Sequence, residues 1–110
     1  MNNKFDQKNL WIGFIRVGQN SRNGVLGDAD QAFTNVIGLA KNKADFRLQV
    51  KRVLKTLELQ LLKLEDVELL EQRLSKQSVH KDILALVDGV KKDGQVAFDV
   101  FATFDEDDEE

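Results

Sequence analysis

The end of the chain constrains the fold more than any other part of it. Residues 96–104 (VAFDVFATF) alternate between apolar and other side chains, and six consecutive acidic residues follow at once. Alternation with a period of two is typical of a β-strand with one buried face, here formed by Val96, Phe98, Val100, Ala102 and Phe104. Six adjacent carboxylates cannot be buried without a partner. We therefore expect a closing strand of the core that ends where the acidic residues begin.

Charge divides the chain into two parts. The whole chain has 19 acidic residues against 16 Lys and Arg, which gives a net charge of −3. Residues 1–104 hold 13 of these acids and all 16 bases, so they carry +3, whereas residues 105–110 carry −6. We expect residues 1–104 to form a single α+β domain, since this length suits one domain, and residues 105–110 to form an acidic C-terminal tail.

Two strands and a helix are predicted in the first half of the chain. Residues 10–17 are apolar, β-branched and aromatic, which is typical of a buried strand, and residues 32–40 predict a second strand. Residues 18–30, rich in glycine and small polar side chains, predict a loop. Asn42 is a candidate N-cap for a helix whose apolar side chains follow a 3.6-residue period, namely Phe46, Val50, Val53, Leu54 and Leu57.

The segment 57–76 allows two interpretations. It can continue the preceding helix, since Leu, Glu, Lys and Gln all favour helices. We prefer a strand over residues 59–65, where the side chains mostly alternate, and a short helix over residues 67–74 with Asp66 as its cap. Ser78 would then cap a further helix, which Gly94 ends.

These elements predict an α+β fold with a small, mostly antiparallel sheet of about four strands and two main helices on one face. All phenylalanines except Phe5 lie in predicted elements, so we interpret them as core residues rather than as a platform for stacking bases. The residues predicted to share one core are Phe46, Val50, Val53, Leu57, Val87, Phe98, Val100 and Phe104.

Few residues of this chain can support catalysis. There is no Cys and one His, His80, which excludes thiolate chemistry and paired-histidine metal sites. No serine lies in a Gly-x-Ser-x-Gly context, and the glycines of residues 18–30 lack the spacing of phosphate-binding loops. We therefore expect no enzymatic activity, no cofactor and no metal.

Targeting signals are also missing from the sequence. Residues 1–8 are polar and unlike a signal peptide, and no apolar run approaches the ~20 residues that a membrane span needs. We therefore expect a cytoplasmic protein that does not enter the membrane.

A cluster of carboxylates surrounds the start of the predicted short helix and consists of Glu65, Asp66, Glu68 and Glu71. Paired carboxylates can act as acid and base, or can hold Mg²⁺ or Ca²⁺. The EF-hand spacing is absent, however, and a helix N-terminus favours acids because its N–H groups are free. We prefer this second explanation and treat the cluster as a charged surface.

A row of cations lies on the outer side of the helix that follows Asn42 and consists of Arg47, Lys51, Arg52 and Lys55. Such a row provides sequence-independent affinity for phosphates, so one interpretation is a nucleic-acid-binding module. A charged outer face is also what an exposed amphipathic helix requires, and the chain has no RNP or helix-turn-helix signature. The acidic tail would repel phosphates as well. We therefore rank nucleic-acid binding below protein binding.

The α+β layout, the missing catalytic set, the carboxylate cluster and the acidic tail together resemble the small immunity proteins of bacterial toxin systems, including contact-dependent inhibition. This resemblance implies a cytoplasmic inhibitor that binds a basic toxin domain, typically a nuclease, and covers its active site with carboxylates. The residues then expected to bind the partner are Glu65, Asp66, Glu68, Glu71, Asp99, Asp105, Glu106 and Asp107.

Overall fold

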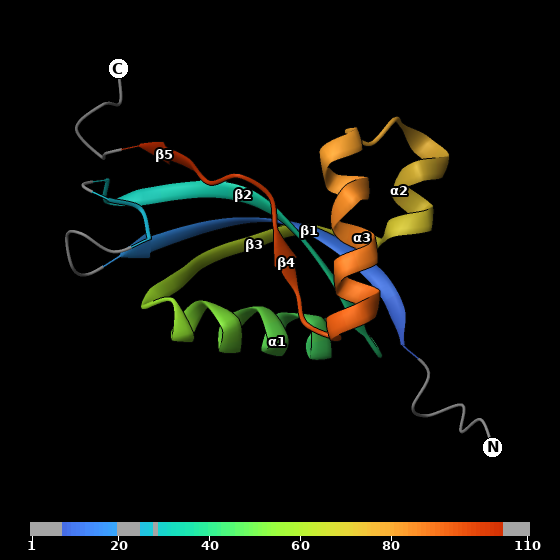
Figure 1. Cartoon of the computed structure of the whole chain (residues 1–110), viewed down its shortest axis with the longest axis horizontal. Helices are drawn as coiled ribbons and strands as arrows, with labels where there is room; N and C mark the ends of the chain where they lie inside the picture. The colour runs from blue at the N-terminus through green and yellow to red at the C-terminus, as the bar shows by residue number, and fades with distance from the viewer. Residues whose placement is uncertain (1–7, 20–24, 28, 105–110) are drawn as a thin grey trace.

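The computed structural model describes residues 8–19, 25–27 and 29–104, and it confirms an α+β fold built on a mostly antiparallel sheet (Figure 1). The elements follow in the order β1 (Asn9–Gln19), β2 (Gln31–Ala40), α1 (Lys43–Thr56), β3 (Leu59–Leu69), α2 (Leu70–Lys76), α3 (Lys81–Asp93), β4 (Ala97–Phe98) and β5 (Ala102–Phe104). The predicted strand after the first helix is therefore present, and the long-helix alternative for this segment is wrong.

The sheet is organised around β1 and β2. The strand order is β3-β1-β2-β4, and β5 pairs with the other end of β2, from Gln31 to Phe33. Every pairing is antiparallel, so β2 and β3 run parallel to each other on either side of β1. Helix α1 makes the crossover between them, which places β3 at one edge of the sheet and β4 and β5 at the other.

Helix α1 covers one face of the sheet. As predicted, the Asn42 side chain caps this helix by accepting a hydrogen bond of 2.8 Å from the backbone N–H of Asp45. The apolar stripe that begins at Phe46 then packs on β1 and β2. This core contains the fully buried residues Ile15, Val17, Ala32, Val36, Ala40, Phe46, Val50 and Leu54, with Val53, Leu57 and Phe98 packed against it.

Helices α2 and α3 lie against the opposite face. The prediction that the two main helices lie on one face of the sheet is therefore wrong. Ile12 and Ile37 belong to a second core with Leu70, Ile83 and Val90, whereas their chain neighbours on β1 and β2 point towards α1. Val87 packs against this second core and is therefore separated from Phe46. The physical reason is that β1 and β2 carry apolar residues on both faces, so both faces need cover.

The predicted closing strand is interrupted in the middle. β4 and β5 are separate short strands, and Val100 between them is 83% exposed, so its assignment to the core is wrong. The backbone turns outward here while keeping its polar groups satisfied, because Thr34 Oγ1 donates to the Val100 carbonyl (3.1 Å) and the Asp99 N–H donates to the Asn35 carbonyl (3.0 Å). Phe104 is half-buried on the face opposite α1.

Two helices also begin at other residues than predicted. β3 continues to Leu69 because it pairs with β1 as far as Trp11, so α2 starts at Leu70, and Asp66 is not its cap. Asp66 instead has φ 55 within a β-strand, a left-handed conformation that Asp tolerates. Helix α3 is capped by His80, whose Nδ1 accepts from the Asp82 N–H (3.1 Å), and not by Ser78.

Candidate functional site

The structure divides the predicted acidic surface into separate parts. Glu65, Asp66 and Glu68 lie on β3, and Glu71 lies in the first turn of α2, so these four remain neighbours. Asp99 lies between β4 and β5, beyond β2, and is thus at the other edge of the sheet. The remaining predicted partner-binding residues, Asp105, Glu106 and Asp107, are outside the residues that the structure describes.

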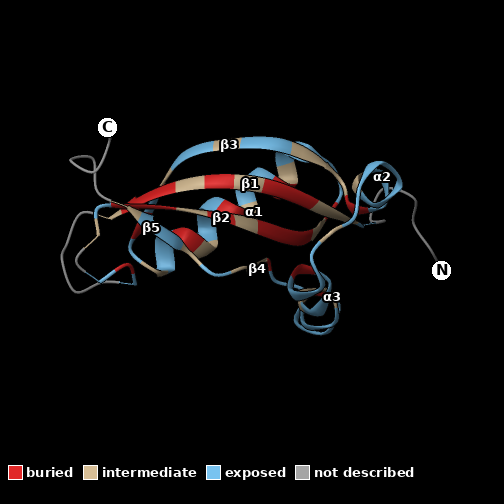
Figure 2. Ribbon diagram, turned by 90° about the horizontal axis from the view of Figure 1, so that it is seen from above, coloured by how far each residue is buried: buried red, intermediate tan, exposed pale blue. Residues whose placement is uncertain are grey.

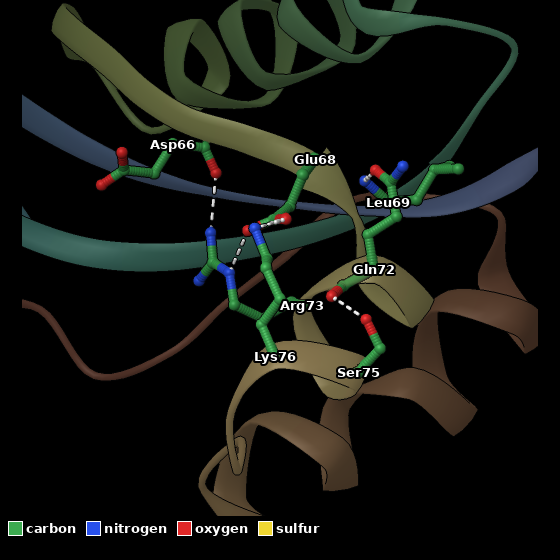
Figure 3. Close-up of polar contacts among 7 residues, drawn as sticks. All are labelled: Asp66, Glu68, Leu69, Gln72, Arg73, Ser75 and Lys76. Carbon is green, nitrogen blue, oxygen red and sulfur yellow. Dashed lines mark hydrogen bonds and ion pairs between the residues drawn. The ribbon is translucent and has the colours of Figure 1, made fainter.

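Glu68 is neutralised by the chain itself (Figure 3). Its carboxylate forms an ion pair with Lys76 (2.6 Å) and another with Arg73. The hydrogen bond from Lys76, and then the one from Arg73, lowers the pKa of the Glu68 carboxyl below its ordinary value. Because both oxygens already have cationic partners, Glu68 ties α2 to β3 and has little charge left for another molecule.

The other three carboxylates of the cluster are more available. Glu65 is exposed and lies 3.5 Å from Lys63 on the same strand. Arg73 donates to the backbone carbonyl of Asp66 (2.7 Å), and the Asp66 side chain points away from it (Figure 3). Among the described residues, the carboxylates of Asp66 and Glu71 have no hydrogen-bond or ion-pair partner. These two exposed groups can therefore meet a cation on another molecule.

The ion pairs of Glu68 lead to a pH prediction. The pKa of the Glu68 carboxyl is lower in the folded protein than its ordinary value of 4.5. The ionised carboxylate therefore stabilises the fold at pH values above 4.5, and this stabilisation is lost as the pH falls through the lowered pKa. Glu68→Gln should therefore destabilise the protein at neutral pH and lose less of its remaining stability in acid. Urea denaturation at about pH 7 and about pH 3 measures both effects.

The control for this prediction is Glu71→Gln, which removes a carboxylate of the same cluster, three residues later on α2, without breaking an ion pair between described residues. Its free energy of unfolding should equal that of the wild type at both pH values. If Glu68→Gln also kept the acid sensitivity of the wild type, the two ion pairs would not stabilise the fold.

An apolar groove of about 370 Å³ adjoins Glu71. Its leucines come from β1, β2, the end of β3 and α2, namely Leu10, Leu39, Leu69, Leu70 and Leu74, and its polar rim consists of Lys8, Asn9, Glu71 and Lys91. Leu74 is 45% exposed although it is a large apolar residue. The sequence alone does not reveal this groove, because its leucines are brought together from four separate elements. The spacing of Leu70 and Leu74 on one helix was the one local sign of it.

A second groove, of about 790 Å³, runs between α1 and the start of β3. Its lining is Lys51, Arg52, Lys55, Glu58, Leu59, Gln60 and Leu61. Three of the four cations predicted on the outer side of α1 therefore line a concave surface, and the fourth, Arg47, is also exposed. In the part of the chain that the structure describes, none of these four cations forms an ion pair.

Three phenylalanines form a row on the sheet face opposite α1. The rings of Phe14 and Phe33 are 5.5 Å apart and those of Phe33 and Phe104 are 4.8 Å apart, with nearly parallel planes. Arg16 lies over Phe33 and Phe104 and donates to Gln31 (2.5 Å). Figure 2 looks onto this face, and no helix crosses it at the end near β5. The stacked rings and Arg16 therefore stabilise one another across β1, β2 and β5.

The remaining chemical features of the described residues are sparse. No group of three or more His, Asp or Glu side chains among residues 8–19, 25–27 and 29–104 is arranged to hold a metal ion. His80 is exposed and its Nδ1 serves as the cap of α3. No helix in these same segments is long and apolar enough to cross a membrane.

Comparison with protein-family models found no matching family, and comparisons with curated proteins and with solved structures found no significant match.

Proposed function

We propose that this protein is a cytoplasmic, non-catalytic inhibitor of the immunity type, which neutralises a basic toxin domain by binding it directly at the surface around α2. The observation that carries this proposal is the leucine groove beside Glu71. Protein interfaces combine an apolar centre with a polar rim, and the affinity comes mainly from a few anchor residues at that centre. Leu74 is well placed as an anchor, since it is both exposed and part of the groove.

Two carboxylates set the preference for a basic partner: Glu71 lines the groove, and Asp66 lies on β3 outside its lining. Asp66 and Glu71 are exposed and free of cationic partners among the described residues, so they can speed the encounter with a positively charged surface. Glu68 contributes through its ion pairs, which fix α2 on β3. Lys8 and Lys91, which also line the groove, can pair with acidic groups of the partner and so fix the orientation of the complex.

The position of Asp99 places it outside the proposed interface. It lies at the opposite edge of the sheet from β3, and three strand spacings of about 4.8 Å separate these edges. A partner seated on α2 therefore does not need Asp99. We assign the contact to Asp66, Glu71 and the leucine groove.

Co-expression tests this proposal directly. If the product of the neighbouring open reading frame stops bacterial growth, co-expression of this protein should restore growth, because binding blocks the toxin. Leu74→Asp should abolish the rescue, since it places a charge at the apolar centre of the interface. The effect is measured by the growth of cells that co-express the toxic product with the wild type or with Leu74→Asp, and by whether the complex can be purified from each.

The matched control is Leu84→Asp. Leu84 is 40% exposed on α3, much like Leu74, but it does not line the groove, so this variant should rescue as well as the wild type. Equal rescue by Leu74→Asp and Leu84→Asp would exclude the groove as the interface. A neighbouring product without toxicity, or toxicity that the wild type does not relieve, would contradict the inhibitor function.

A further inference from the structure

We propose a second binding surface that is separate from α2: the groove between α1 and the start of β3 binds the sugar–phosphate backbone of a nucleic acid, without regard to its sequence. This surface lies on the face of the sheet that α1 covers, whereas the leucine groove involves α2 and the last turn of α3. The two surfaces can therefore be tested independently.

Four cations of α1 are left unneutralised by the described part of the chain. Arg47, Lys51, Arg52 and Lys55 are all exposed, and none has an ion-pair partner within the described segments. Other cations of the described residues are paired, since Glu68 receives both Arg73 and Lys76, whereas Lys81, Lys91 and Lys92 on α3 are exposed without an ion pair. The groove beside α1 gathers three cations that are unpaired among the described residues, whereas the leucine groove has two, Lys8 and Lys91.

Nearby acids do not cancel this charge. Asp45 is the sole acid of α1, and its carboxylate accepts from the backbone N–H of Lys41 (2.9 Å) and from Gln49 (3.2 Å) at the start of the helix. Glu58 is the one acid in the groove lining, against three cations. The groove therefore keeps a positive charge, which favours a polyanion.

The spacing of the cations fits a phosphate backbone. Arg47, Lys51 and Lys55 are four residues apart, so each step along the helix axis is about 6 Å and the row is about 12 Å long. One strand of a nucleic acid presents a phosphate about every 3.4 Å along its axis, so the row together with Arg52 can neutralise roughly three or four phosphates.

The lining distinguishes this groove from the leucine groove. Leu59 is buried and Leu61 is half-buried, so the lining offers no exposed large apolar side chain that could act as an anchor for a protein. Phosphates need cations and no apolar anchor, and this groove supplies cations. The chemistry thus favours a nucleic acid over an acidic protein.

Fluorescence anisotropy with labelled oligonucleotides of mixed sequence tests the proposal on the full chain. Binding should weaken steeply with salt, with a slope of log K against log[salt] of about −3 for a duplex, and two unrelated sequences should bind within about twofold of each other. Lys51→Glu combined with Arg52→Glu should lower the affinity at low salt by at least tenfold, because two cations of the groove become acids.

The matched control is Lys81→Glu combined with Lys92→Glu, which makes the same change in net charge at two exposed lysines of α3 that line neither groove. It should bind within about twofold of the wild type. Equal losses in the two double variants would show that only net charge matters and would overturn the assignment of the groove. Absence of binding, or a polyglutamate chain that binds as tightly as the oligonucleotide, would overturn the proposal as well. Far-UV circular dichroism of each variant identifies any loss of fold.

Discussion

Val50→Asp is expected to unfold this protein at room temperature. Val50 is 0% exposed in the core between α1 and the sheet. An unpaired carboxylate at this position loses its hydration and gains no partner, which costs several kcal/mol. Since small domains are stable by only ~5–15 kcal/mol in total, this loss removes most or all of the stability. Far-UV circular dichroism and urea denaturation should show the absence of a cooperative unfolding transition.

Leu48→Asp is the control for this prediction. Leu48 lies two residues earlier on the same helix, but it is 48% exposed, so the new carboxylate stays hydrated. This variant should fold and should change the free energy of unfolding by less than about 1 kcal/mol. If Val50→Asp unfolded at the same urea concentration as Leu48→Asp, α1 would not pack on the sheet as described.

Gly38→Ala should destabilise the protein by about 1–3 kcal/mol, the second large effect. A Cβ at this position of β2 would lie 2.5 Å from Cγ1 of Val96 and 3.2 Å from Cε1 of Phe46. Both neighbours are buried, so neither can move aside without disturbing the core. The midpoint of urea denaturation should fall while the slope of the transition stays unchanged.

Gly89→Ala provides the matched comparison, with an effect of opposite sign. Gly89 lies within α3, and a Cβ at this position would meet no other atom within 4 Å. Alanine favours a helix over glycine by about 1 kcal/mol, so this variant should be more stable than the wild type. A stabilising Gly38→Ala would contradict the close packing of Val96 and Phe46 against β2.

The two proposed surfaces depend on charges of opposite sign, which the small net charge of the chain does not reveal. Carboxylates gather on β3 and α2 and free cations on α1, although the formal net charge is only −3. A protein partner on α2 and a nucleic acid on α1 would then occupy different surfaces. The variants Leu74→Asp and Lys51→Glu/Arg52→Glu separate these two activities.

Local sequence signals determined the elements whose cause is itself local. Asn42 caps α1 as expected, and Gly94 ends α3 with φ 72 and an N–H that donates to the Val90 carbonyl (2.8 Å). Caps, glycine ends and side-chain periodicity act over four residues or fewer, so the sequence displays the candidates directly, although α3 uses His80 as its cap in place of the candidate Ser78. The α+β class and the strand that begins at Leu59 followed from the same patterns.

Tertiary pairing decided the elements whose cause is distant in the chain. β3 reaches Leu69 because β1 supplies partners up to Trp11, which overrides the capping signal of Asp66. The closing segment, in turn, breaks around Val100, where its register against β2 shifts by one residue between the pair Val36–Phe98 and the pair Phe33–Ala102. In neither case does the sequence of a segment show which strand it will pair with.

The candidate sites show the same division. The sequence by itself determined the cationic row of α1, because residues four apart on a helix share one side. Only the tertiary structure decided that Arg73 and Lys76 neutralise Glu68, that Asp99 lies at the far edge of the sheet, and that five leucines form a groove beside Glu71. Helical spacing is a local property of the chain, whereas ion pairs and grooves depend on which distant segments the sheet brings together.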